Sequence, residues 1–162
     1  MSREKSTQRQ HLLAEADGAL RKMSAQSTLF GHAIANSLGI RPTDLECLDL
    51  IQLHGSVTAS QLAKATGLTS GAVTGLVDRL EQAGYVLRKP DANDRRRTNI
   101  ELHPSTFERV YPLYASLHER MQSIWADFDD EQVQTILDFA TRSHETVAEE
   151  TARLRKGTKK GK

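Results

Sequence analysis

The sequence predicts a mainly α-helical fold with one small β-hairpin, and three patterns in its 162 residues support that prediction. Stretches near both ends repeat apolar residues every three or four positions, which places those residues on one face of a long helix. Shorter stretches of the same spacing lie between them and are separated by glycines, which readily end helices. Residues 85–89 and 98–102 read as strands and are joined by turn-forming residues, which indicates a β-hairpin.

The first long helix is expected over residues 6–38, with Gly39 ending it. Its apolar residues, Met23 and Phe30 among them, alternate spacings of four and three and form a stripe close to a heptad repeat. A stripe of this length usually packs on an equally long helix, here one from a second subunit. We therefore predict that residues 1–40 form an N-terminal dimerisation helix.

Two further long helices are expected in residues 104–154, and we predict that they are C-terminal dimerisation helices. The first begins at Pro104, a residue that suits the first position of a helix, and continues to about Phe128 with a kink near Pro112. Three acidic residues then favour the N-terminus of the second helix through the helix dipole. The lysine-rich residues 155–162 are predicted to form a basic, disordered tail.

A shorter helix is predicted after Pro42, at the start of the middle part of the chain (residues 41–103). Thr43 followed three residues later by Glu46 matches a capping box, in which two side chains satisfy free backbone N–H groups at the helix start. Gly55 ends this helix, and a short extended link follows it.

A second capping box, Thr58 and Gln61, opens another short helix, which Gly67 ends. The next helix follows almost at once, and Val73 is placed to pack back into the crossing of the two helices. Two short helices joined so tightly form a helix-turn-helix. An ordinary αα-hairpin is the alternative that this pattern alone leaves open.

Residues 69–84 form the second of these two helices. Thr69 is a suitable N-cap, and Gly84 can adopt the left-handed conformation that ends helices. The opposite face begins with small hydroxyl and alanyl side chains, so it can lie close to another surface, which we predict to be the DNA major groove. The apolar residues of the helix share one face: Val73, Leu76, Val77 and Leu80.

The hairpin that follows has three consecutive arginines at its tip, Arg95, Arg96 and Arg97. A helix-turn-helix followed by a hairpin with a basic tip is a winged helix. The predicted fold class is therefore mainly α with a small β-hairpin wing, a winged helix-turn-helix lobe between long dimerisation helices. Guanidinium groups suit the narrow, strongly negative minor groove of DNA, whereas a merely solvated hairpin tip is the alternative.

Charge is distributed unevenly although the formal net charge is only +1. Residues 88–97 hold five basic residues against two acidic ones, and six basic residues without an acid lie between Arg153 and the end. Basic patches on an otherwise acidic molecule favour local contact with a polyanion such as double-stranded DNA.

Several other classes of protein are not expected. No apolar run approaches the roughly 20 residues that span a bilayer, so we expect a soluble, cytoplasmic protein without membrane contact. The six histidines lack the spacing of a metal site, and no phosphate-binding loop or nucleophile motif is present. We therefore expect no catalytic residue, no cofactor and no metal.

Cys47 is the single cysteine, so an internal disulfide cannot form. It lies on the apolar face of the helix predicted after Pro42, between Glu46 and Leu48. A reactive cysteine needs an electropositive and partly exposed setting, so a buried structural thiol is favoured over a redox switch.

These features resemble the MarR family, the multiple-antibiotic-resistance regulators, over nearly the whole length of the chain. The resemblance implies a homodimeric winged-helix transcription factor, in many members a repressor whose DNA affinity falls when a small aromatic ligand binds. The local match is strongest in Leu76-Val77-Asp78-Arg79-Leu80-Glu81 with Gly84, and in Asp94-Arg95-Arg96 leading into Ile100 and Leu102.

Within this resemblance, the recognition helix is residues 69–83, and Thr69, Ser70 and Thr74 are its candidate DNA contacts. The wing contacts are the three arginines already named. Asp94 is expected to brace the wing, with Arg79 either bracing Asp94 or contacting phosphate. The chain departs from the family pattern at two recognition-helix positions, where it has Ala72 and Gly75.

An effector site is expected between the dimerisation helices and the DNA-binding lobe. Its candidate lining is Phe30, His32, Ile51 and Tyr111, with Tyr114 as an alternative to Tyr111, although ordinary core packing would equally account for each. We predict a ligand-responsive repressor of a pseudo-palindromic operator. The alternative is a winged-helix dimer that binds and antagonises a protein without specific DNA binding.

Overall fold

The computed structural model describes the backbone of residues 2–91, 94 and 97–159, and the side chains of residues 6–91, 94 and 97–157. These residues form six helices and one three-stranded antiparallel sheet, which confirms the predicted fold class. None of the helices in this part of the chain combines the length and apolar composition that crossing a bilayer requires.

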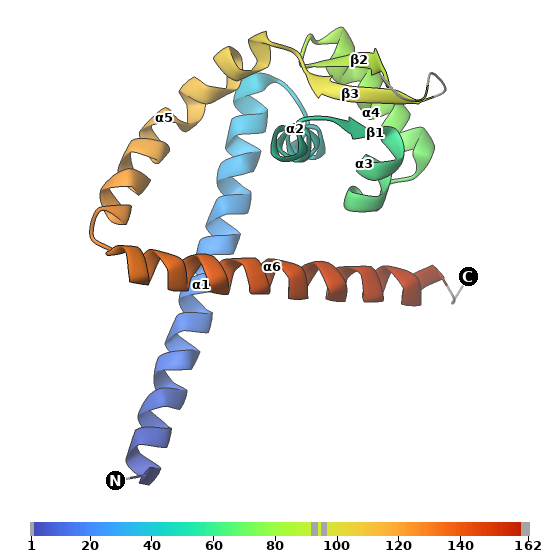
Figure 1. Ribbon diagram of the computed structural model, residues 1–162. Coiled ribbons are helices and arrows are strands. Elements are labelled where there is room, and N and C mark those ends of the chain that lie inside the picture. The colour runs from blue at the N-terminus through green and yellow to red at the C-terminus, as the bar shows by residue number, and fades with distance from the viewer. Residues whose placement is uncertain (1, 92–93, 95–96, 160–162) are drawn as a thin grey trace.

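The central part of the chain folds into a lobe in which short helices pack around one small sheet (Figure 1). The strand order is β1-β3-β2, with Val57 opposite Ile100 and Val86 opposite Leu102. The elements of the lobe are α2 (Pro42–His54), β1 (Val57–Thr58), α3 (Ala59–Thr66), α4 (Ser70–Gln82), β2 (Val86–Pro90) and β3 (Thr98–Leu102).

One large apolar cluster forms the core of the lobe. All four apolar residues predicted to share one face of α4 are buried in it, which confirms the periodicity of that helix. Tyr85 is fully buried beside them, and its hydroxyl donates to the Leu38 carbonyl at 3.3 Å, so the lobe is fastened to the end of the first helix. The cluster consists of Cys47, Leu48, Ile51, Val57, Leu62, Val73, Leu76, Val77, Leu80, Tyr85, Val86 and Ile100.

The start of α2 differs from the prediction. Because Pro42 occupies the first helical position, the N-cap is Arg41, and the side chain at the third position, Asp44, accepts a hydrogen bond from the Arg41 N–H at 3.3 Å. The predicted capping box of Thr43 and Glu46 is therefore wrong by two residues. The capping box of α3 forms as predicted.

The two C-terminal helices are α5 (Ser105–Trp125) and α6 (Asp130–Lys159). Pro104 precedes α5 as its N-cap instead of being its first residue, and α5 continues through Pro112. Reciprocal hydrogen bonds between Asp129 and Gln132, at 2.8 and 2.9 Å, open α6 in the region where the acidic residues predicted its start.

The last helix extends further than predicted. It remains helical to Lys159, so the expected disordered tail is wrong for residues 155–159, and residues 160–162 lie outside the described part of the chain. Smaller differences are that β2 covers residues 86–90 instead of 85–89 and that α5 ends three residues before Phe128.

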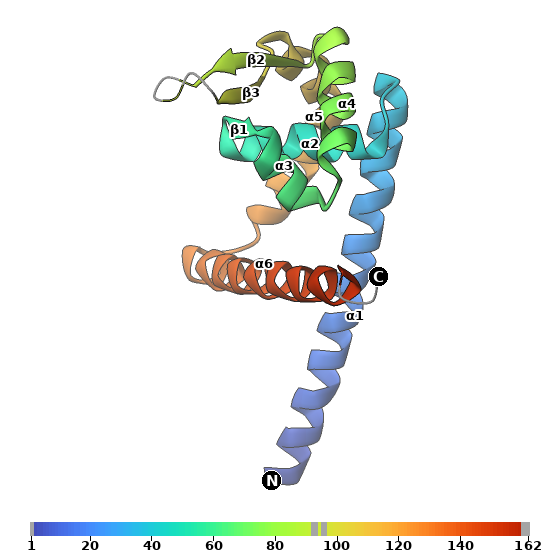
Figure 2. The same cartoon turned by 90° about the vertical axis from the view of Figure 1, so that its right-hand side faces the viewer.

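The long helices reach the lobe only in part and extend beyond it. The helix α1 (Ser2–Leu38) packs on α2 through Ile34 and Ala35 near its C-terminus, whereas its N-terminal part extends far from the lobe, and α6 runs below the lobe in a different direction from α1 (Figures 1 and 2). Apolar side chains along all three helices are exposed within one chain. They include Leu12, Met23, Leu29, Phe107, Leu117, Ile124, Leu137, Phe139, Val147 and Leu154.

Candidate nucleic-acid interface

The helix-turn-helix consists of α3, a three-residue connection and α4. Thr58 begins it, since its Oγ1 accepts from the Gln61 N–H at 3.3 Å while its own N–H donates to Gln61 Oε1 at 2.7 Å. Gly67 ends α3 in the left-handed region at φ +76°, and its N–H donates to the Ala63 carbonyl at 2.9 Å. Glycine adopts this conformation without steric cost, which explains the tight turn.

The N-terminal end of α4 is exposed and carries the three hydroxyl residues predicted to contact DNA. Thr69 is the N-cap, as expected, because its Oγ1 accepts from the Ala72 N–H at 3.3 Å. The Thr74 hydroxyl donates to the Ser70 carbonyl at 3.0 Å. The Ser70 hydroxyl has no hydrogen-bond partner among the described residues, so it is the one of the three that is not already used within the helix.

Small residues follow on the same helix. A Cβ added at Gly75 would meet only the Arg79 Nη1 atom, at 3.9 Å, which is ordinary van der Waals distance. A Cβ at Gly71 would meet nothing within 4 Å. Packing within the chain therefore does not require glycine at either position.

Arg79 fastens the recognition helix to α2. Its Nη2 donates to Asp44 Oδ1 at 2.8 Å, and its Nη1 donates to the Gly75 carbonyl at 3.0 Å. The prediction that Arg79 braces Asp94 is therefore wrong, because the side chain runs along its own helix to a buried carboxylate on α2. The same contact gives the buried Asp44 its counter-ion.

The described part of the wing is held by Asp91, a residue that the sequence analysis treated only as a turn former. Its carboxylate accepts from the Asp94 N–H and from Asn99 Nδ2, both at 3.0 Å, and so links the two sides of the hairpin. Arg97 is exposed, and its N–H donates to the Asp94 carbonyl at 2.8 Å. Arg95 and Arg96 lie outside the described residues.

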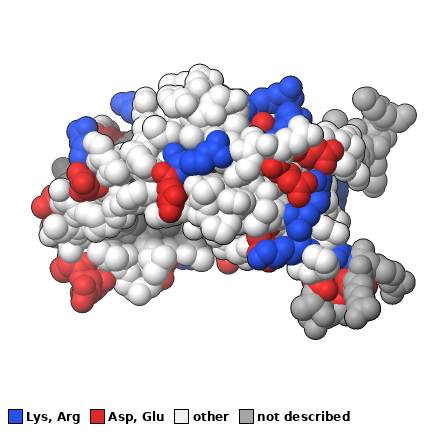
Figure 3. All heavy atoms as spheres, turned by 90° about the horizontal axis from the view of Figure 1, so that it is seen from above, with Lys and Arg blue, Asp and Glu red and all other residues white. Residues whose placement is uncertain are grey.

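The base of the wing is less cationic than the sequence count suggested. Arg88 of β2 pairs with two acids of α4, Asp78 at 2.6 Å and Glu81, and Lys89 pairs with Glu101 at 2.6 Å. Desolvation lowers the pKa of Arg88, but these two acidic partners outweigh it and raise that pKa above its ordinary value. Figure 3 likewise shows positive and negative side chains interspersed on this face of the molecule.

A contact with α6 lies beside the turn. Arg155 donates to the carbonyl groups of Lys64, Ala65 and Thr66 at 3.2, 3.0 and 2.9 Å, which are the groups left free at the C-terminus of α3. Sequence reasoning missed this role because it placed Arg155 in a disordered tail.

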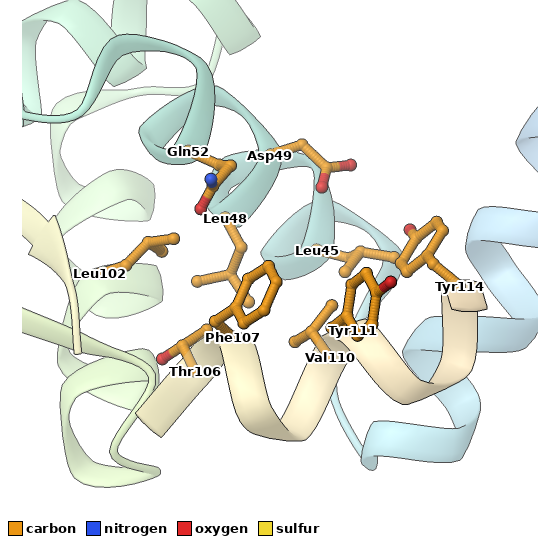
Figure 4. A pocket seen from close by; sticks show the side chains of 10 residues that line it. All are labelled: Leu45, Leu48, Asp49, Gln52, Leu102, Thr106, Phe107, Val110, Tyr111 and Tyr114. Atoms are coloured by element: carbon orange, nitrogen blue, oxygen red, sulfur yellow. The ribbon is translucent and has the colours of Figure 1, made fainter. Parts of the chain in front are cut away.

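Four residues were predicted to line an effector site, and the structure separates them. Tyr111 lines a pocket of about 260 Å³ between α2 and α5 (Figure 4). Phe30 reaches the pocket only indirectly, through an edge-to-face contact with the lining Tyr114 at 5.5 Å between ring centroids. Ile51 is instead fully buried in the lobe core, and His32 is exposed on α1 away from the pocket.

Nine residues line the pocket together with Tyr111. The helical spacing of residues 107, 110, 111 and 114 places one face of α5 against α2. This spacing is the sequence signal that could have identified the α5 part of the lining. The nine are Leu45, Leu48, Asp49, Gln52, Leu102, Thr106, Phe107, Val110 and Tyr114.

Cys47 is buried in the lobe core. Burial above all, and then the negative charges of Asp44 and Glu46, raise its pKa from 9.0 to about 11. The side chain is therefore a protonated thiol at neutral pH, which is the form that reacts poorly with oxidants. Among the described residues, no group of three or more histidine, cysteine or acidic side chains could hold a metal ion.

Comparison with known proteins places these features in one family. Residues 40–98 match the sequence profile described as the MarR family. YcgE of Bacillus subtilis (strain 168), an uncharacterized HTH-type transcriptional regulator, is 38% identical over 135 residues, which cover 83% of this chain and 88% of the relative. Both matches are to transcriptional regulators and not to enzymes.

Solved structures share the fold at lower identity. A mutant of MepR from multidrug-resistant S. aureus aligns with a TM-score of 0.69 at 22% identity, covering 82% of this chain and 96% of that one. A mutant of MarR from E. coli, complexed with operator DNA, aligns with a TM-score of 0.51 at 22% identity, covering 78% and 91%. With the helix-turn-helix, the wing and the long flanking helices all in place, the chain belongs to the MarR family of transcriptional regulators.

Proposed function

We propose that this chain is a homodimeric, ligand-responsive repressor that binds a pseudo-palindromic operator in double-stranded DNA. The observation that carries the proposal is the exposed N-terminal end of α4, which rests on a rigid helix-turn-helix and presents only small side chains. A helix of this shape fits the major groove, and the fold neighbour from E. coli was solved with operator DNA. As a bacterial-type regulator it acts on DNA in the cytoplasm.

The recognition helix α4 contributes more to positioning the protein on the DNA than to reading the base sequence. The Ser70 hydroxyl and the free N–H groups at the start of α4 are suited to phosphate, which fixes register without reading sequence. Because packing does not require Gly75, its missing side chain is best explained by close approach to DNA. Thr69 and Thr74 contribute through hydroxyls that also stabilise the helix.

The wing supplies much of the affinity. Arg97 is exposed next to a hairpin that Asp91 holds in shape, and Arg95 and Arg96 precede it in the sequence. An arginine in the minor groove contacts the most negative part of the duplex. The dimer doubles each of these contacts, with the two recognition helices in successive major grooves roughly 34 Å apart.

Dimerisation accounts for the exposed apolar stripes of α1, α5 and α6. Within one chain many apolar side chains of these helices are exposed to solvent, and apolar surface of this extent marks a protein interface. A second copy supplies helices of matching length, so α1 and α6 become part of a shared core. Sedimentation of the whole protein at micromolar concentration is expected to give a dimer.

The experiment that tests the DNA-binding proposal is footprinting of the promoter region next to the gene, followed by fluorescence-anisotropy titration with the protected duplex. Arg96→Ala and Arg97→Ala should each weaken binding and reduce the salt dependence. The expected reduction is roughly two units of slope, since two phosphate contacts are lost in each dimer.

Lys89→Ala is the matched control, because it removes a positive charge that is already paired with Glu101. The affinity of the Lys89→Ala variant for the operator duplex should change by less than about twofold. Protected inverted repeats support the proposal. Absence of any protection at low salt would contradict it and favour a dimer that binds a protein instead.

A further inference from the structure

The charge of the residues that line the pocket between α2 and α5 indicates which class of ligand the pocket can bind. Among its ten lining residues, one is acidic, none is basic, and most of the rest are apolar or aromatic. Its volume of about 260 Å³ is close to the lower end of the range for ligand pockets, about 300 Å³, and suits a ligand with one ring.

Asp49 lies at the rim of this pocket (Figure 4). Its carboxylate makes no hydrogen bond or ion pair with another described residue. Asp49 is exposed within one chain, and partial desolvation, followed by the charge of Glu46 one turn earlier, raises its pKa, so neither effect comes from a neighbouring cation. Burial, and then the negative charge of Asp49, raise the pKa of Tyr114, so the charge of Asp49 acts on a residue that lines the pocket.

Aromatic rings complete the arrangement. Phe107 and Tyr111 are stacked with their centroids 4.9 Å apart, and Tyr114 follows on the next turn of the same face of α5. The faces of aromatic rings carry partial negative charge and attract cations, most strongly where water is excluded. An anionic ligand would meet Asp49 with no basic lining residue to offset the repulsion.

We propose that this pocket binds small aromatic or lipophilic cations, with the positive group between Asp49 and the rings of α5 and the apolar part against Leu45 and Leu48. The proposal rests on the proposed function, because it assigns a ligand class to the effector site of that regulator. Binding there contacts α2 and the first turns of α5 together, which are the elements that join the lobe to the dimerisation helices.

The test compares three one-ring probes of different charge on the whole protein: benzyltrimethylammonium, benzyl alcohol and benzoate. Dissociation constants are measured by ligand-observed NMR titration. The cation should bind at least about fivefold more tightly than the alcohol, because this ratio of dissociation constants corresponds to the free energy of one half-exposed ion pair. Benzoate should bind most weakly.

Two variants locate the effect. Asp49→Asn should abolish the preference for the cation while leaving the affinity for benzyl alcohol within about twofold. Glu46→Gln, on the same helix but outside the pocket lining, is the matched control and should retain most of the preference. Tyr111→Ala should weaken both the cation and the alcohol, with circular dichroism confirming that the variant is folded.

The outcomes separate this inference from the proposed function. If the cation and the alcohol bind equally, or if Asp49→Asn keeps the preference, the assignment of a cation is overturned. If Tyr111→Ala leaves cation binding unchanged, the cation binds elsewhere and the site is overturned. Operator binding by the same preparations without a probe is scored independently, so loss of that activity refutes the regulator proposal alone.

Discussion

Replacing Asp44 with alanine should destabilise the protein by breaking the contact that holds the recognition helix on α2. The Asp44 side chain is only 5% exposed, whereas that of Arg79 is 40% exposed. The substitution removes the carboxylate, leaves the guanidinium without its counter-ion, and also deletes the acceptor for the Arg41 N–H at the start of α2.

The magnitude follows from these exposures. Breaking a fully buried pair costs about 3–5 kcal/mol, and an exposed pair contributes about 0.2–1 kcal/mol. Because water can reach Arg79 once its partner is gone, about 2 kcal/mol is expected from the pair. The lost acceptor at the helix start adds about 0.5 kcal/mol. For a chain of 162 residues, a total near 2.5 kcal/mol lowers the melting temperature by roughly 5–10 °C.

Urea titration followed by circular dichroism, at one fixed protein concentration, measures the change. Asp44→Asn is the matched variant, since its single amide oxygen can still accept from Arg79 or from the Arg41 N–H but no longer from both, and it should lose only about half as much. A double-mutant cycle with Arg79→Ala should give a coupling energy of about 1–2 kcal/mol. If Asp44→Ala changes the unfolding free energy by less than about 0.5 kcal/mol, the ion pair does not fasten the recognition helix.

Three other substitutions give separate tests. Gly75→Ala should raise the unfolding free energy by about 1 kcal/mol, because Ala suits a helix interior and its Cβ has room, while weakening operator binding in anisotropy titrations; unchanged operator affinity would refute close approach to DNA. Leu76→Ala should cost about 2–5 kcal/mol in urea titrations, as expected for a 2%-exposed core residue, and a cost below about 1 kcal/mol would contradict the packing. The pKa of Cys47 is raised from 9.0 to about 11, so the folded state keeps the thiol proton to higher pH and loses stability between about pH 9 and pH 11. Subtracting the stability of Cys47→Ala at each pH should isolate this decline, and a flat difference would contradict the burial of the thiol.

The features that were predicted well depend on local sequence. The N-cap at Thr69, the left-handed glycines at 67 and 84, and the buried face of α4 all follow from residues within a few positions of one another. Helix periodicity and caps are set by such short-range contacts, so the residue pattern alone is enough to place the helix-turn-helix. The strand β3 was placed correctly for the same reason.

The features that were missed depend on distant residues or on competition between neighbours. Arg79 and Asp44 are 35 positions apart, and Arg155 caps α3 across about 90 positions, so no local pattern joins them. At the start of α2, two capping boxes overlap in sequence, and Pro42 decides between them by occupying the first helical position.

The residues predicted to line the effector site show a different limit of prediction from sequence. Periodicity identifies the apolar face of α2, but it does not distinguish an inward residue that fills the core from one that borders a cavity. Ile51 is of the first kind, whereas Leu48 contacts both the core and the pocket. Only the placement of α5 over α2 makes that distinction.

Gly67 limits which substitutions are tolerated together at positions 67 and 155. A Cβ at this position would lie 2.9 Å from both Cζ and Nε of Arg155, in addition to requiring a positive φ. Asparagine tolerates the left-handed conformation, yet it would still push the guanidinium away from the three carbonyl groups at the end of α3. The residues acceptable in the turn therefore depend on what stands at position 155, on a helix far along the chain. Substitutions at 67 and 155 should be epistatic: once Arg155 is shortened, Asn at position 67 no longer displaces a contact, and the cost that remains is that of the backbone alone.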